Sequence, residues 1–142
     1  MDNERYQAEL SVFRLNKFPQ SAYRFVGMDT ANPYLLIGAV TNSKHTYTLK
    51  IDLSTFPMSV PKVFVTKMLK TKSGEDMNSC SGAMHTLTAE NGCTRICHYG
   101  PSSWTPNVSL FKIYVKCRLW LEMYEAHLRT GHPIDYYLNH QA

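Results

Sequence analysis

The chain has 142 residues, of which 44% are hydrophobic and 18% are charged. These are the proportions of an ordinary globular protein, so we expect a single domain over residues 1–142 with one hydrophobic core. The net charge of +4 is too small to indicate a nucleic-acid partner, and the apolar runs are too short to cross a membrane.

The polar start of the chain does not have the pattern of a secretory signal, so we expect a soluble, cytoplasmic protein. In that compartment the four cysteines are expected to be reduced thiols rather than disulfides. They are Cys80, Cys93, Cys97 and Cys117.

An amphipathic pattern predicts a helix at the start of the chain. Its apolar face consists of Tyr6, Leu10 and Phe13, which recur at helical spacing. Asp2 or Asn3 can cap the first turn, and the Phe-Pro step at 18–19 is expected to end the helix, because proline cannot continue it.

Four strands are expected next, at 22–26, 34–40, 46–53 and from Lys62 onward. The second is almost continuously apolar, as in a strand buried on both faces, whereas the third alternates and should bury one face. Short connections favour an antiparallel meander, since parallel strands need a long crossover. Residues 68–84 are polar and contain glycine, so we expect an extended, exposed loop there.

A long helix is expected to close the domain. Its apolar stripe, at three- and four-residue spacing, consists of Leu110, Ile113, Cys117, Trp120, Leu121, Tyr124 and Leu128. Ser109 can cap its start, while Gly131 and Pro133 should end it. The expected fold class is therefore α+β, with an N-terminal helix, a four-stranded antiparallel meander and a long C-terminal helix.

The residues between 84 and 110 carry the strongest functional signal. Met84-His85-Thr86-Leu87 is followed by Asn91-Gly92, then by Ile96-Cys97, and then by Trp104-Thr105-Pro106 before the long helix. This order resembles the active-site segment of ubiquitin-conjugating enzymes, in which a His-Pro-Asn, a Gly, an Ile-Cys and a Trp-x-Pro follow one another.

A second segment has the same resemblance. Phe56-Pro57, Pro61 and the Val63-Phe64-Val65 run are similar to the family's aromatic-Pro…Pro-x-Val-x-Phe segment, where the third strand leads into the fourth. The two prolines fix φ and withhold donors, so the chain turns there before the next strand begins. Together the two segments imply a ubiquitin-conjugating-type (UBC-like) fold.

The resemblance also implies an enzyme, a cysteine acyltransferase. In the family the cysteine of the Ile-Cys pair carries a protein C-terminus as a thioester, which assigns Cys97 as the nucleophile. A cysteine in a loop just past a strand suits this role, because a thiolate attacks acyl groups and a thioester stays reactive toward amines. The resemblance gives His85 a mostly structural role, with its ring bonding nearby backbone.

One departure from the family pattern concerns the oxyanion. The family has an Asn that is thought to support the oxyanion during aminolysis, where this chain has Leu87, which cannot donate a hydrogen bond. Losing one such donor usually costs about a hundredfold or more in rate. Either another group substitutes, with His98 as the best local candidate, or aminolysis is not the main chemistry. Weaker candidates are Thr86, Thr88 and Asn91.

Other interpretations of these residues stay open. A zinc site could use Cys80, His85, Cys93, Cys97 and His98, although their spacing lacks paired C-x-x-C knuckles. A Cys/His/Asp triad has no acid at an informative spacing. Leu87 also favours a non-catalytic module of the same fold that binds a ubiquitin-like protein or another partner. Outside the zinc alternative we expect no metal and no cofactor.

The run from Trp120 to Gly131 resembles the ending of bacterial relatives of the family, found in anti-phage (CBASS-type) operons. There the enzyme joins the C-terminus of a cGAS-like nucleotidyltransferase to other molecules. The implied partner is such a nucleotidyltransferase or a ubiquitin-like protein, in some systems with a separate activating enzyme. Because the chain has no Gly-rich nucleotide-binding loop, it either receives an activated partner or cleaves a C-terminal extension through Cys97.

Overall fold

The computed structural model describes residues 1–139, and in this part of the chain one antiparallel sheet of six strands packs against helices. The strand order is β1-β2-β3-β4-β6-β5. The elements are α1 (Asn3–Leu15), η1 (Gln20–Ala22), β1 (Tyr23–Val26), β2 (Tyr34–Val40), β3 (Thr46–Asp52), β4 (Val63–Val65), β5 (Thr86–Glu90), β6 (Cys93–Ile96), η2 (Pro101–Ser103), α2 (Leu110–Thr130) and α3 (Ile134–Asn139). The expected α+β class and antiparallel pairing are confirmed, but the sheet has six strands instead of four.

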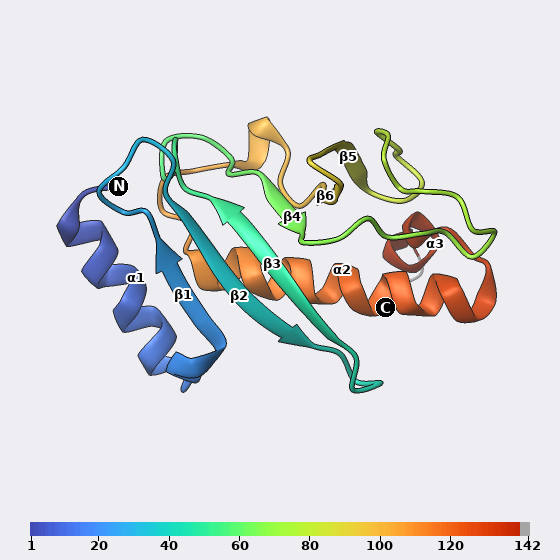
Figure 1. Ribbon diagram of the computed structural model, residues 1–142, viewed down its shortest axis with the longest axis horizontal. Helices are drawn as coiled ribbons and strands as arrows, with labels where there is room; N and C mark the ends of the chain where they lie inside the picture. Colours follow the sequence, from blue (N-terminus) through green and yellow to red (C-terminus); the bar gives the residue numbers. More distant parts are fainter. Residues whose placement is uncertain (140–142) are drawn as a thin grey trace.

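The helix α1 begins as expected and ends earlier. The Asp2 carboxylate accepts a hydrogen bond from the Arg5 backbone N–H at 2.8 Å, which makes Asp2 the cap. The helix stops at Leu15, before the Phe-Pro step, because Lys17 adopts a left-handed conformation with φ 54°. Figure 1 shows α1 beside β1.

The expectation that β2 is buried on both faces is wrong. Leu35, Ile37 and Ala39 are buried, while the alternate residues are only partly covered and Val40 is 49% exposed. The reason is visible in Figure 1, where α2 runs along one face of the sheet. The alternation expected for β3 is confirmed, with its odd-numbered residues buried.

The segment 68–84 is only in part the exposed loop that its composition indicates. Most of its polar residues are exposed, but Leu69 and Met77 are buried in the core. Between them Lys70 and Asp76 form an antiparallel bridge, and the Leu69 N–H donates to the hydroxyl of Thr94 at 2.9 Å. The two apolar side chains therefore fasten an otherwise polar segment to the domain.

The long helix α2 packs against one face of the sheet and buries the core. Its stripe is buried except for Leu128, the hydroxyl of Ser109 accepts from the Lys112 N–H at 3.1 Å, and Gly131 ends the helix with φ 83°. After Pro133 the chain forms one more short helix, α3, which was not expected and which packs against α2. Within residues 1–139, no helix has the combined length and hydropathy needed to cross a bilayer.

Candidate functional site

The backbone places Cys97 directly beside His85. β5 and β6 form a hairpin whose turn, Asn91-Gly92, has positive φ at both residues, as Asn-Gly hairpin turns do. The ladder continues one pair beyond the Thr86–Ile96 pair, because the Cys97 N–H donates to the His85 carbonyl oxygen at 2.9 Å. Two residues that lie apart in sequence are thereby fixed as cross-strand neighbours.

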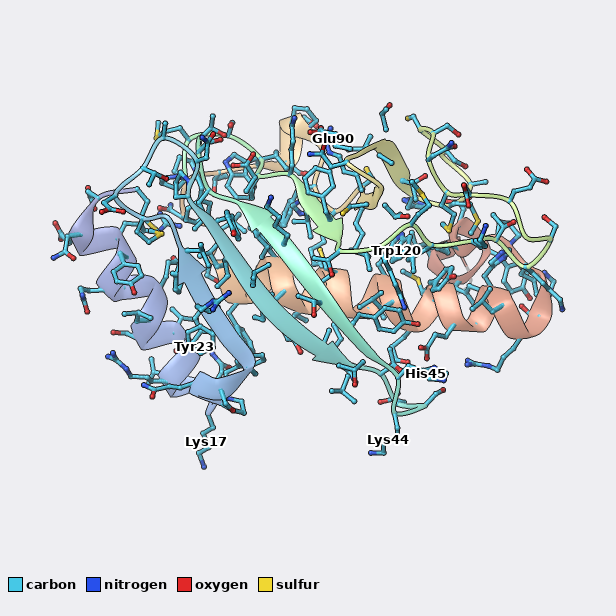
Figure 2. The ribbon with its side chains drawn as sticks, in the orientation of Figure 1. Lys17, Tyr23, Lys44, His45, Glu90 and Trp120 are labelled. Atoms are coloured by element: carbon cyan, nitrogen blue, oxygen red, sulfur yellow. The ribbon has the colours of Figure 1, made fainter. Side chains whose placement is uncertain are left out.

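Cys97 is half-buried and lines a pocket of about 260 Å³. His85 and His98 line the same pocket, so the structure brings all three predicted site residues together. The remaining walls come from the helices: Lys116, Leu119, Trp120 and Met123 of α2, and Leu138 of α3. Figure 2 shows Trp120 on α2, toward the end where α3 packs. The helical wall of the pocket is thus apolar except for Lys116, and the two histidines make the pocket polar around the sulfur.

The ring of His85 is held by a carboxylate from α3. Its Nε2 donates to Oδ1 of Asp135 at 2.8 Å, and the Asp135 backbone N–H donates to the Ala83 carbonyl oxygen at 2.8 Å. The ring partner is thus a carboxylate, where the family resemblance implied nearby backbone. The same contact provides the acid that the sequence did not reveal for a Cys/His/Asp arrangement. A carboxylate that orients a histidine beside a thiol is typical of activated nucleophiles.

His98 is neutral, and its one ring hydrogen is used in a hydrogen bond to the backbone. Burial, together with the charges of Lys116 and Arg95, lowers its pKa to about 4, against the opposing effect of the Pro61 carbonyl. Its Nε2 lies 2.9 Å from the Pro61 carbonyl oxygen, and because a carbonyl can only accept, Nε2 carries the hydrogen. Nδ1 then carries no hydrogen; it is buried and has no hydrogen-bond partner among residues 1–139. In this tautomer the ring hydrogen of His98 points to the Pro61 carbonyl oxygen, so His98 offers no donor for an oxyanion.

The other candidates for the missing oxyanion donor lie elsewhere. Thr86 is buried in β5 and its hydroxyl donates to the Ser79 carbonyl oxygen at 3.1 Å. Asn91 occupies the hairpin turn and, with Cys93, lines a different hollow beside β2 and β3. Thr88 and Leu87 are not among the residues that line the Cys97 pocket. Among the described residues, none of Thr86, Thr88 and Asn91 therefore brings an uncharged hydrogen-bond donor to the Cys97 sulfur.

Lys116, like Asp135, is a site residue that the sequence interpretation missed. It lines the pocket from α2, and its ammonium lies 3.7 Å from the centre of the Tyr99 ring. Burial and the nearby Lys112 lower the pKa of Lys116, while Cys117 and Cys97 oppose the shift. Its spacing gave a signal, because a residue four positions before Trp120 lies on the same helical face as that tryptophan.

The two segments that carry the family resemblance are in contact. The indole N–H of Trp104 donates to the Pro57 carbonyl oxygen at 3.0 Å, and its ring lies edge-on to Phe56. Tyr99 also packs edge-on against Trp104, and His98 binds the carbonyl of Pro61, as described above. The loop after Cys97 is thus anchored to the turn between β3 and β4, which fixes one side of the pocket.

The zinc alternative is not supported by the geometry. Within the part of the chain that the structure describes, no group of three or more His, Cys, Asp or Glu side chains could hold a metal ion. Cys80 is exposed, and Cys93 lines the other hollow. Of the five candidate ligands, only His85, Cys97 and His98 share a pocket.

Comparisons of the chain with protein-family models, with curated proteins and with solved structures find no match. The function must therefore be argued from the geometry of the site and from the order of its residues.

Proposed function

We propose that this protein is an enzyme, a cysteine acyltransferase of the ubiquitin-conjugating type. Cys97 takes up the C-terminus of a partner protein as a thioester and passes it to an acceptor amine. The observation that carries the proposal is the position of the Cys97 thiol, half-buried in a pocket that also holds His85, His98 and a lysine. A histidine that shares a pocket with a thiol is the usual general base for a cysteine nucleophile.

The proton movements follow from the same contacts. His85, oriented by Asp135, accepts the proton of Cys97 as the sulfur attacks the carbonyl carbon of the partner's C-terminus. When the leaving group is the amine of a C-terminal extension, the His85 imidazolium returns this proton to it and the C–N bond breaks. When the partner arrives already activated by a separate enzyme, a thiolate leaves instead. The His85–Asp135 pair favours the first route, because an amine is the leaving group that needs an acid.

The partner in this proposal is a protein with an accessible C-terminus. The resemblance of the Trp120–Gly131 run to bacterial members of the family supports a cGAS-like nucleotidyltransferase, with a role in anti-phage defence; a ubiquitin-like protein is the other candidate. Coexpression with each candidate, followed by intact-mass spectrometry, tests the choice. The adduct must carry the mass of the complete or processed partner.

The acyl-carrier step can be tested without knowing the partner. A synthetic peptide α-thioester supplies an activated acyl group, and intact-mass spectrometry should show one adduct that hydroxylamine or thiol removes. Cys97→Ala should lose this adduct while its circular dichroism stays native, and Cys93→Ala is the matched control that should keep it. An adduct of equal yield on Cys97→Ala would refute the proposal.

A second candidate is a non-catalytic module that binds a partner through this fold. It is favoured by Leu87 and by the positions of Thr86, Thr88 and Asn91, which bring no replacement donor to the pocket. In that case the wild-type protein would form no adduct with the thioester probe, and Cys97→Ser would bind a captured partner as tightly as wild type does.

A further inference from the structure

A second hollow, of about 470 Å³, lies where the tip of the β2–β3 hairpin meets the later part of α2. It shares no lining residue with the Cys97 pocket. Three of the residues that line it are basic, namely Lys44, His45 and Lys67, and none is acidic. Figure 2 shows Lys44 and His45 at the tip of the hairpin. The hollow therefore gathers basic side chains that the proposed mechanism does not use.

The ring of His45 is held by a buried carboxylate of α2. Its Nδ1 donates to Oε2 of Glu125 at 2.8 Å, and the hydroxyls of Tyr47 and Thr41 donate to the same oxygen at 2.7 and 3.0 Å. Glu125 is only 3% exposed; burial raises its pKa, but these hydrogen bonds lower it by more, so the carboxylate is ionised. Because Nδ1 faces Glu125, the other ring nitrogen, Nε2, faces away from it on a side chain that is 67% exposed. A protonated His45 therefore offers an oriented N–H to a ligand in the hollow.

Lys67 brings a second cation to the same cluster. Its ammonium lies 5.0 Å from the centre of the Tyr47 ring, and the hydroxyl of that tyrosine shares the Glu125 oxygen with His45. Within residues 1–139, neither Lys67 nor Lys44 forms an ion pair with a carboxylate. The charge of Glu125 is used in its contact with His45, so both lysines are available to an anion.

We propose that this hollow binds the phosphate group of a small molecule, with His45 and Lys67 as its charged donors. Such cations form short, charge-assisted hydrogen bonds with phosphate oxygens. The lining also includes Leu69 and Leu128, whose apolar side chains suit the organic part of a phosphate ester, and the volume is that of a small-molecule site. The site is independent of the proposed acyl transfer, since it uses none of the residues around Cys97.

The hollow beside β2 and β3 provides a comparison within the same sheet. It too contains a lysine over a tyrosine ring, because the ammonium of Lys50 lies 4.5 Å from the centre of the Tyr34 ring. Asp52 and Glu90 line that hollow, however, and their carboxylates repel a phosphate. Lys50 and Lys67 thus share a charge and an aromatic contact, and differ in the acidic groups around them.

The experiment titrates the full-length, ¹⁵N-labelled protein at constant ionic strength and about pH 6, where histidine side chains in general are largely protonated. The probes are phenyl phosphate, inorganic phosphate, and phenol, which has the apolar part alone. Two-dimensional NMR spectra give Kd and locate binding through the backbone amides of residues 44–47 and 67. Wild type is compared with Lys67→Gln, His45→Asn and the control Lys50→Gln. Asparagine can still donate to Glu125 but has no counterpart of Nε2, and circular dichroism verifies the fold of each variant.

We expect phenyl phosphate to shift these amides saturably, with a Kd that rises about tenfold or more in Lys67→Gln and in His45→Asn and is unchanged in Lys50→Gln. Inorganic phosphate that binds as tightly as phenyl phosphate would support the phosphate contact and assign free phosphate as the ligand; weaker binding would support a phosphate ester. Phenol that binds as tightly as phenyl phosphate would overturn the proposal, because the hollow would then select apolar groups alone. An unchanged Kd in Lys67→Gln, an equal loss in Lys50→Gln, or no saturable shift at millimolar phenyl phosphate would also overturn it.

Discussion

Replacing His98, the half-buried histidine next to Cys97, should remove a defined part of the pH dependence of folding. Burial lowers the pKa of His98 to about 4, whereas an unfolded histidine titrates near about 6.5. As the pH falls through about 6.5, His98 binds a proton in the unfolded chain, whereas in the folded chain it stays neutral down to about pH 4. The folded state therefore loses stability across this window. Between about pH 7 and about pH 5 the loss is about 2 kcal/mol, because each unit of difference in pKa is worth about 1.4 kcal/mol.

His98→Gln tests this number. The glutamine amide nitrogen can still donate to the Pro61 carbonyl, but the side chain does not titrate. Urea unfolding at both pH values should show a wild-type loss that exceeds the loss in His98→Gln by about 2 kcal/mol. His132→Gln, at an exposed histidine, is the matched control and should behave as wild type. Equal pH dependence of wild type and His98→Gln would mean that the folded protein admits a proton at His98, which would contradict the burial argument.

Two further predictions concern other parts of the molecule. Glu125→Ala should cost about 3 kcal/mol in urea unfolding, because the buried hydroxyls of Tyr47 and Thr41, which donate to Oε2 of Glu125 at 2.7 and 3.0 Å, lose their acceptor. Leu121→Ala should cost about 3 kcal/mol in the same assay, because it opens a cavity at a fully buried position of α2.

The long helix and the central strands could be predicted because their signals are local. The bounds of β2 match the expected range of 34–40, and the cap at Ser109 and the left-handed Gly131 are where sequence placed them. Each of these features is determined by residues within one turn or one strand, so the local sequence is sufficient to predict it. What sequence could not give for β2 was the extent of burial, since that depends on which face α2 covers.

The β5–β6 hairpin was missed because two of its three buried positions are polar. Thr86 and Thr94 are 2% and 0% exposed, so two inward positions lack the apolar residues from which a half-buried strand is predicted. Their hydroxyls are satisfied by distant backbone, Thr94 by Leu69 and Thr86 by Ser79. A hydrogen-bonded threonine can be buried at small cost, but only the folded chain shows that its partner is present. Asn91-Gly92 marked the turn without revealing the strands on either side.

In the candidate site, too, residues that are close together in sequence were predicted, and residues from distant elements were not. Sequence order singled out Cys97, His85 and His98, which the structure places around one pocket. Lys116 and Asp135 were missed because they come from elements that follow the motif; the helical spacing of Lys116 relates it to Trp120 but not to Cys97, and no spacing relates Asp135 to His85. Asp135 lies beyond Pro133, where the sequence indicated only the end of a helix.

The short helix α3 belongs to the site more closely than its position near the end of the chain suggests. Asp135 holds the ring of His85 and donates its backbone N–H to Ala83, while Leu138 forms part of the pocket wall. The orientation of the proposed base and the shape of the space beside the sulfur therefore both depend on α3 staying docked on α2. Since Ile134 is fully buried, this docking is an extension of the main core rather than a surface contact. In the proposed mechanism the reactivity of Cys97 therefore depends, through Asp135 and Ile134, on the stability of the short helix that packs on α2.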